Sequence, residues 1–223
     1  MNQKNVIGTV HHVLFTMLCG LCIGGLVCDV SRADGAQWHS LFDGTTLGKW
    51  KPTEFGGEGA VSIEDGVLHL AIGSDMSGIT WTGDFPRTDF ELELEARRDD
   101  GFDFFCGLTF PVGEGVCSMI VGGWGGTIVG LSSVDGYDAS ENDTTTAGDF
   151  ESDQWYTIRV QVTSEKIVCS IDEEKVIEQE RDGHTFDVRA EMLLSCPVGV
   201  ATYATEASFR NIRWRTISPS SDE

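Results

Sequence analysis

Residues 89–97 read Asp-Phe-Glu-Leu-Glu-Leu-Glu-Ala-Arg, a strict alternation of apolar and charged side chains. Successive side chains of a β-strand point to opposite faces, so this pattern predicts a strand with one buried face and one solvated face. The apolar face begins with Phe90 and Leu92, and the charged face carries Glu91, Glu93, Glu95 and Arg97. The stretch therefore predicts a sheet that packs on a core with one side and meets water with the other.

The same two-residue period recurs along the chain, whereas no segment after residue 34 shows a helical period with caps. Residues 61–64 and 67–70 flank Asp65-Gly66, which predicts a tight hairpin because glycine takes positive φ at no steric cost. A second hairpin is expected at residues 155–163 and 167–171, and a third with its turn at Glu173-Glu174. Further strands are expected at residues 104–110, 116–121, 127–131, 199–204 and 208–216. About ten to twelve short strands predict an all-β fold, a sandwich of two antiparallel sheets.

Composition excludes several classes of partner. The chain has 223 residues with 15 Lys and Arg against 36 Asp and Glu, a formal charge of −21. Such a surface repels phosphate backbones and anionic lipid heads, so we expect neither nucleic-acid binding nor binding to membrane surfaces. The length and the 40% of hydrophobic residues suit a single globular core.

The first 33 residues are expected to be a signal peptide. Residues 13–27 form an apolar run that is too short for a transmembrane helix, and Ser31-Arg32-Ala33 offers small residues for cleavage. A lipid anchor is a weaker alternative, because neither Cys22 nor Cys28 follows a small residue. We therefore expect an exported, periplasmic or extracellular protein without membrane insertion after cleavage, with one domain over residues 34–217 and a flexible tail at residues 218–223.

Four cysteines remain after this cleavage, and two interpretations of them stay open. Cys106, Cys117, Cys169 and Cys196 could form disulfides in an oxidising compartment, or they could be buried free thiols. None shows the CxxC spacing of a zinc site.

Residues 132–153 are rich in Asp, Ser, Thr, Gly and Glu and are expected to form a long loop. The hard oxygen ligands of this loop could hold calcium, the one cofactor that the sequence indicates, although a solvated loop is the simpler interpretation. The residues in question are Asp135, Asp138, Glu141, Asn142 and Asp143.

Two of the six tryptophans are bracketed by small residues. Trp81 lies in Thr-Trp-Thr-Gly-Asp and Trp124 in Gly-Gly-Trp-Gly-Gly. Small neighbours leave an indole exposed, and exposed indoles stack on the C–H faces of sugar rings; a buried ring with glycines making room for it is the alternative. Trp50, Trp155 and Trp214 lie in patterned strands and are expected to be core residues.

Several motifs together resemble one known family. They are LFDGTTLGKW (41–50), VSIEDGVLHL (61–70), DFELELEAR (89–97), WYTIRVQVTSEKIVCSIDEEKV (155–176) and ASFRNIRWRTI (207–217). In these segments the chain resembles the 3-keto-disaccharide hydrolase domain family (DUF1080), in particular exported proteins of the planctomycete type. The resemblance implies a concanavalin A-like jelly roll whose concave sheet binds sugar, and a hydrolase that acts on oxidised sugars outside the cytoplasm.

The chemistry that this resemblance implies needs a base. A ketone at C3 of a sugar acidifies the C2 proton, so a carboxylate can remove that proton while the C1 oxygen leaves, and water adds afterwards. Glu93 and Glu95 lie on one strand face about 7 Å apart, a spacing at which two carboxylates can flank one glycosidic bond. Glu95 and Asp103 also match polar positions of the family. The candidate catalytic residues are Glu95, Asp103 and Glu93, and solvated strand acids are the alternative.

Two departures from the family favour a different class of function. The family commonly carries an arginine near Thr109 and a carboxylate near Ser118, and this chain has neither. The second candidate function is therefore a non-catalytic carbohydrate-binding or adhesion domain on the same scaffold. Under either function the partner is a carbohydrate, and the expected contacts are Trp81, Asp84, Arg97, Trp124 and Asn142.

Overall fold

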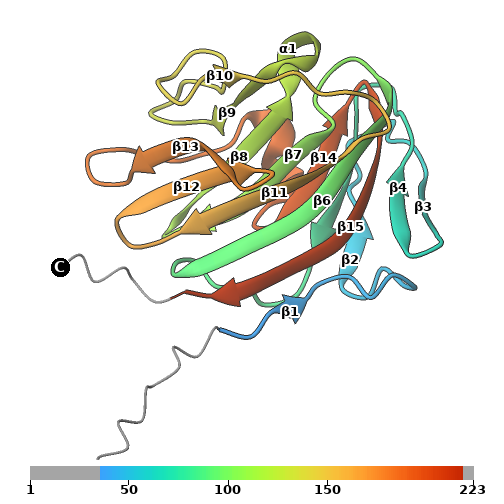
Figure 1. The fold of residues 1–223 in the computed structure, drawn as a ribbon, viewed down its shortest axis with the longest axis horizontal. Helices are drawn as coiled ribbons and strands as arrows, with labels where there is room; N and C mark the ends of the chain where they lie inside the picture. The colour runs from blue at the N-terminus through green and yellow to red at the C-terminus, as the bar shows by residue number, and fades with distance from the viewer. Residues whose placement is uncertain (1–35, 218–223) are drawn as a thin grey trace, which may run out of the picture. The chain divides into compact units, whose positions relative to one another are not determined.

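The computed structural model describes residues 36–217, which form two antiparallel β-sheets (Figure 1). Sheet A has eight strands in the order β13-β12-β11-β6-β15-β4-β3, with β1 paired to β15. Its strands are β1 (His39–Ser40), β3 (Val61–Glu64), β4 (Val67–Leu70), β6 (Phe90–Gly101), β11 (Trp155–Val162), β12 (Lys166–Ile171), β13 (Glu174–Glu180) and β15 (Thr205–Thr216).

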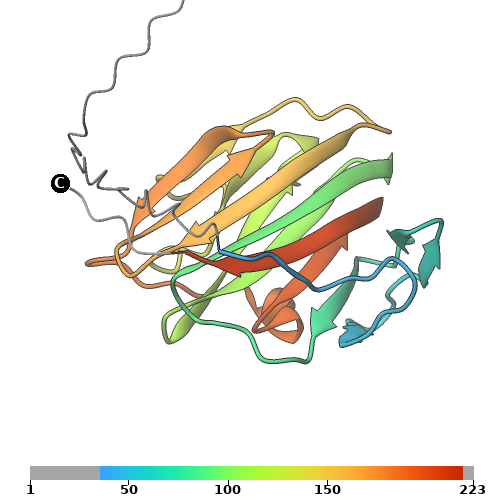
Figure 2. The same ribbon diagram turned by 60° about the horizontal axis from the view of Figure 1, so that its bottom comes forward.

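Sheet B has seven strands in the order β10-β9-β8-β7-β14-β5-β2. They are β2 (Trp50–Pro52), β5 (Met76–Trp81), β7 (Cys106–Val112), β8 (Gly115–Gly122), β9 (Ile128–Ser132), β10 (Thr146–Ala147) and β14 (Gly199–Tyr203). The helical elements are the short turn α1 (Gly123–Gly126) and the 3₁₀-helix η1 (Ala190–Ser195). Figure 2 shows the two layers from a second side, with β6, β11 and β15 in one layer and β7, β8 and β14 in the other. The predicted sandwich of two antiparallel sheets is confirmed.

The alternating stretch at residues 89–97 forms most of β6, a central strand of sheet A. Its apolar side chains, from Phe90 to Ala96, are fully buried between the sheets. They share one hydrophobic core with Leu108 and Phe110 of sheet B. Burying large apolar side chains from both sheets in one core is what holds the layers together.

Two predicted turns are present, one of them displaced by one residue. Asp65 and Gly66 both take positive φ (48° and 83°) between β3 and β4, as a tight hairpin requires. Between β12 and β13 the positive-φ residues are Asp172 and Glu173, one residue earlier than expected. β13 therefore already starts at Glu174, which pairs with Ile171 across the turn.

The segment after β9 is more ordered than the loop that its composition predicts. β10 pairs with β9, and Ala139 is completely buried against β9, where its carbonyl oxygen would lie 2.5 Å from a Cβ at Gly130. This segment therefore packs on sheet B instead of extending into solvent.

All four described cysteines are free thiols, and Cys106, Cys117 and Cys169 are buried. In the β7–β8 hairpin, Cys106 pairs with Val121 and Cys117 with Phe110, so these two cysteines are four positions apart along the ladder. Of the two interpretations, the structure therefore shows the buried thiols.

The expected signal peptide and the expected tail lie outside the described residues. Within residues 36–217, no helix is long and apolar enough to cross a membrane.

Candidate functional site

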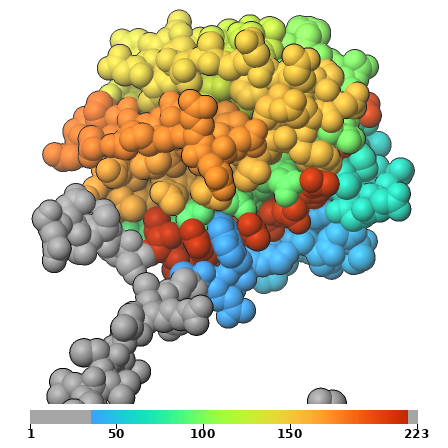
Figure 3. Space-filling model, viewed as in Figure 1, coloured from blue at the N-terminus to red at the C-terminus, as the bar shows by residue number. Residues whose placement is uncertain are grey.

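The outer face of sheet A carries Glu93 and Glu95, and both are held in ion pairs. Arg159 and Arg213 each approach a different carboxylate oxygen of Glu93 to 2.5 Å. Arg210 lies 2.6 Å from Glu95, whose other oxygen accepts a hydrogen bond from Asn211. Figure 3 shows this side of the molecule, with β6 in green and β15 in red.

The prediction that the charged face of β6 is solvated is wrong for Glu91 and Glu93, which are buried. The reason is that the arginines of β11 and β15 lay their aliphatic stems and guanidinium groups over the two carboxylates. Desolvation alone would raise the pKa of Glu93, but hydrogen bonds from Arg159 and Arg213 outweigh it and lower this pKa. A carboxylate that is held ionised by two cations is a poor proton acceptor. This placement argues against Glu93 as a base, and it separates Glu95 from the cleft described next.

The outer face of sheet B is built from small residues, and this lets other segments lie directly on it. A Cβ at Gly199 would lie 2.5 Å from the carbonyl oxygen of Ser195, at the end of η1. A Cβ at Gly107 would touch Met192 of the same 3₁₀-helix at 3.4 Å. The missing side chains therefore make the space in which η1 rests on the sheet.

A cleft of about 300 Å³ remains open on this face beside η1. Its apolar lining is supplied by Met76, Ile120 and Met192. The aromatic residues that line it are Phe104, Trp124 and Tyr203, and the polar ones are Asp103, Ser132, Arg189 and Glu191. An apolar cleft with a few polar groups is typical of a small-molecule site.

Trp124 sits in the turn α1 between β8 and β9, at the top of Figure 1, and the residue is 43% exposed. Its backbone is left-handed (φ 49°, ψ 54°), a conformation that a bulky residue adopts only when its surroundings impose it. One of these constraints is Asp103: its Oδ2 accepts a hydrogen bond from the N–H of Gly125 and its Oδ1 one from the N–H of Phe104. An ionised carboxylate accepts more than two hydrogen bonds, so Asp103 keeps acceptor capacity toward the cleft.

Arg98 supplies the second constraint from inside the fold. Its guanidinium is buried and donates to the carbonyl oxygens of Asp103 (3.4 Å), Gly126 (3.3 Å) and Phe150 (3.2 Å). Burial lowers the pKa of Arg98. Arg98 therefore ties together the connection before β7, the Trp124 turn and the segment at Phe150.

Tyr203 provides a second exposed ring at the cleft. It stacks on Phe104 with 6.0 Å between ring centroids and 28° between ring planes, and it is 38% exposed. The cleft thus presents two exposed aromatic rings, from β14 and from the Trp124 turn.

Arg189 is the cation of the cleft, and two carboxylates hold it. It lies 2.6 Å from Asp138 and 3.0 Å from Glu191. The hydrogen bond with Glu191 raises the pKa of Arg189, and the same bond lowers the pKa of Glu191. Both side chains of the Arg189–Glu191 pair therefore stay charged at neutral pH.

The other expected contacts lie outside this cleft. Trp81 packs edge-on against Trp50 at 5.2 Å and donates its N–H to the carbonyl oxygen of Asp84, which lies in an exposed loop. Arg97 points to the outer face of sheet A, where it pairs with Asp99 and lies over Trp155. Asn142 uses its amide to fold its own loop, donating to the carbonyl oxygens of residues 131, 137 and 138.

Two of the four candidate acids of that loop, Asp135 and Asp138, are bound by other side chains. Asp135 accepts hydrogen bonds from His184 and Thr185, and Asp138 binds Arg189. Among residues 36–217, no three His, Cys, Asp or Glu side chains are grouped so that they could hold a metal ion. The described structure therefore gives the calcium interpretation no support.

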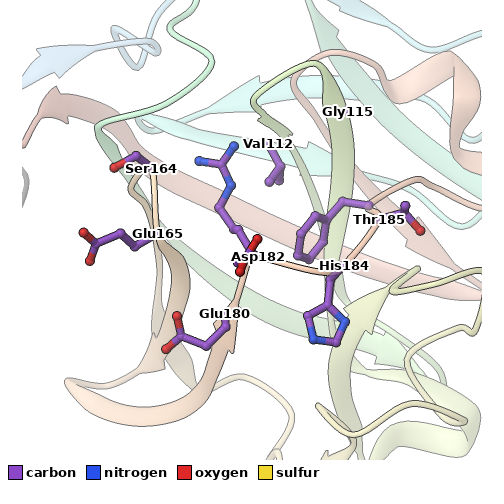
Figure 4. Close-up of a pocket in the computed structure, with 10 residues that line it drawn as sticks. Val112, Gly115, Ser164, Glu165, Glu180, Asp182, His184 and Thr185 are labelled. Carbon is purple, nitrogen blue, oxygen red and sulfur yellow. The ribbon is translucent and has the colours of Figure 1, made fainter.

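A second hollow, of about 630 Å³, lies where the β7–β8 hairpin, the β11–β12 turn and the segment after β13 meet. Figure 4 shows the carboxylates of Glu165 and Glu180 on one side of it and His184 on the other. The guanidinium of Arg181 is engaged with Thr88 and with the carbonyl oxygen of Thr163. None of the residues that line this hollow is an exposed Trp, Tyr or Phe that could stack on a ligand, so the cleft on sheet B is the better candidate for a site.

Sequence reasoning found Asp103 and Trp124 but missed the rest of the cleft. Arg98 did carry a signal, because it continues the odd-even parity of the buried face of β6 and so predicts a charge inside the fold. Tyr203, Arg189 and Glu191 carried none that is local. Thr109 and Ser118, the two positions at which the chain departs from the family, form a buried hydroxyl pair on the outer face of sheet B, with 2.7 Å between their oxygens.

Comparison with known proteins agrees with the two-sheet fold. The family described as the 3-keto-alpha-glucoside-1,2-lyase-like domain matches residues 37–215. A Bacillus subtilis protein of unknown function with a galectin-like fold superposes with a TM-score of 0.56 at 14% identity, covering 81% of this chain and 94% of that one. The carbohydrate-binding module CBM66 of Bacillus subtilis gives 0.50 at 12% identity, covering 75% and 96%. The Crh5 transglycosylase gives 0.55 at 11% identity, covering 82% and 85%. At these identities the likeness shows the fold alone, and no curated protein sequence matches the chain.

Proposed function

The chain belongs to the 3-keto-alpha-glucoside-1,2-lyase-like domain family, and on this premise we propose that the cleft on the outer face of sheet B binds a carbohydrate. The ring of Trp124 carries this proposal. Trp124 is 43% exposed and lines the cleft, and its left-handed backbone is held there by Asp103 and Arg98.

Stacking is the physical basis of this binding. The C–H face of a sugar ring and the face of an indole are both apolar and flat, so their contact removes apolar surface from water. Tyr203 offers a second ring, and the polar groups of Asp103, Arg189 and Glu191 are available to the sugar hydroxyls. The likeness to the fold of a carbohydrate-binding module supports the proposal.

The test is a calorimetric titration with methyl α-glucoside and with trehalose. Neither sugar has a carbonyl at C3, so neither can undergo the elimination discussed below. Trp124→Ala should weaken binding by about 1 to 3 kcal/mol, the loss expected for one exposed aromatic contact. The matched control is Trp38→Ala, which removes an indole that lies over Arg213 and Arg215 on the opposite face. Equal affinity of the wild type and Trp124→Ala, or equal losses in both variants, would overturn the proposal.

The family match favours a second candidate function, the 1,2-elimination of 3-keto-α-glucosides. In this reaction a base takes the proton from C2, the C1–O bond breaks, and the leaving alcohol takes up a proton. The product has a C1=C2 double bond conjugated to the C3 carbonyl. Asp103 is the carboxylate of the cleft nearest in the fold to Trp124, since it binds the next residue in the chain, and it is our candidate base.

The negative charge that develops on the C3 oxygen needs a hydrogen-bond donor, and Arg189 lines the cleft with N–H groups beyond the two that are bonded to Asp138 and Glu191. The test follows methanol release and ultraviolet absorption of the enone from methyl 3-keto-α-glucoside. Asp103→Ala should abolish both signals. Product formation at the wild-type rate in that variant would exclude Asp103 as the base, and no product from the wild type would leave carbohydrate binding as the function.

A further inference from the structure

One hydroxyl group at the cleft has no hydrogen-bond partner among the described residues. Ser132 ends β9, is 1% exposed and lines the cleft. Its Oγ makes no hydrogen bond to any atom of residues 36–217. A buried hydroxyl normally has a partner, and leaving it without one is destabilising.

The neighbouring hydroxyls on sheet B do not share this condition. Ser118 lies directly across from Ser132 on β8, but its hydroxyl is bonded to that of Thr109 on the next strand. Thr109, Ser118 and Ser132 thus form a row of hydroxyls in which only that of Ser132 has no hydrogen bond to the described residues. Ser132 is also the one of the three that lines the cleft.

Two other buried hydroxyls in the described part of the chain lack a partner, those of Ser195 and Thr202. Neither lines the cleft. An unpaired hydroxyl in this fold is therefore not by itself a sign of a site, and the position of Ser132 in the cleft wall sets it apart.

Ser132 and Trp124 both line the cleft, and their backbones are separated along β9. The Trp124 turn leaves β8 at Gly123, which bridges to Ile128 at the start of β9. Ser132 lies four residues further along β9, so its backbone is about 13 Å from that of Ile128 at the usual rise of about 3.3 Å per residue. A single sugar ring stacked on Trp124 does not span this length, whereas a second unit linked to it does.

We infer that the Ser132 hydroxyl hydrogen-bonds an oxygen of the second unit of a saccharide whose first ring stacks on Trp124. This rests on the proposed carbohydrate binding. The second unit is a neutral sugar, because Arg189, the cation of the cleft, is already bound by Asp138 and Glu191. A carboxylate placed against a neutral buried hydroxyl would lose its hydration without gaining a counter-charge.

The experiment compares Ser132→Ala with Ser195→Ala, a matched loss of an unpartnered buried hydroxyl outside the cleft. Each variant is titrated with trehalose, a disaccharide, and with methyl α-glucoside, a single ring. Ser132→Ala should bind trehalose roughly 2- to 12-fold more weakly, the value of one neutral hydrogen bond, and should bind methyl α-glucoside as the wild type does. Ser195→Ala should bind both sugars as the wild type does, and both variants should be at least as stable to urea as the wild type.

Three results would overturn the inference, and they separate it from the proposed function. If Ser132→Ala keeps full affinity for trehalose while Trp124→Ala loses it, the cleft binds sugar without Ser132. If Ser132→Ala weakens both sugars equally, the two-unit arrangement is wrong. If the wild type binds neither sugar, the proposed binding fails and this inference fails with it.

Discussion

The backbone N–H of Gly125 donates a hydrogen bond to Oδ2 of Asp103, with 3.1 Å between the two atoms. This bond joins the connection before β7 to the turn after β8. Since Gly125 directly follows Trp124, it also fixes the backbone of the exposed indole. The backbone of the Trp124 turn is therefore held by the Asp103 side chain.

Asp103→Ala removes this anchor and should loosen the Trp124 turn. We expect weaker binding of methyl α-glucoside, by up to about 1.5 kcal/mol, because the indole is no longer pre-organised. Acrylamide quenching of tryptophan fluorescence measures this loosening. The quenching of the Asp103→Ala/Trp124→Phe double variant is subtracted from that of Asp103→Ala, so that the difference reports the exposure of Trp124 alone. The control is Asp84→Ala, an exposed loop acid outside the cleft. Unchanged quenching of Trp124 would show that Asp103 does not hold the turn.

Arg98 and Arg97 are neighbours in β6 with opposite surroundings, and their methionine variants should differ in stability. Arg98→Met leaves three carbonyl groups without their donor and should lower the free energy of unfolding by about 1 to 3 kcal/mol. Arg97→Met removes a partly exposed ion pair on the outer face of sheet A and should cost less than about 1 kcal/mol. Urea unfolding of both variants measures the difference. A larger loss in Arg97→Met would contradict the role of Arg98 as the tie between the three segments.

Glu93→Gln and Glu95→Gln should differ in stability and agree in sugar binding. The Glu93 side chain is 5% exposed and binds two arginines, so its loss should cost about 1.5 to 3 kcal/mol. Glu95 is 23% exposed and forms an ion pair with one arginine, Arg210, so its loss should cost less than about 1 kcal/mol. Both lie on the outer face of sheet A, so neither should alter trehalose binding or enone formation. Loss of turnover in a stable Glu95→Gln variant would return the active site to sheet A.

Acid should destabilise the protein partly through Glu93. The pKa of Glu93 is lowered in the folded state from its usual 4.5, against the opposing effect of desolvation, by its bonds to Arg159 and Arg213. A group with a depressed folded pKa stabilises fully above its unfolded pKa, and this contribution is lost as pH falls through the folded pKa. Wild-type stability should therefore fall more steeply below about pH 4.5 than that of Glu93→Gln. Urea unfolding between pH 7 and pH 3 measures both slopes, and parallel curves would refute the assignment.

The sequence determined the elements of this fold because the signals for them are local. A two-residue period places Phe90 and Leu92 on one face of a strand wherever that strand lies, and Asp65-Gly66 specifies its turn without outside help. The four glycines around Trp124 likewise indicated an exposed ring, since they leave few side chains that could cover it.

The site was decided by contacts that no local pattern records. Alternation tells which side chains of β6 leave the core, but not what meets them. Glu93 is paired to Arg159 and Arg213, residues 66 and 120 positions away, only because β11 and β15 flank β6 in the sheet. The cleft in turn draws Asp103, Trp124, Tyr203 and Arg189 from four separate segments of the chain. The register of the strands and the packing of η1 on the small residues of sheet B bring these side chains together. Both depend on contacts between segments that are far apart in the sequence.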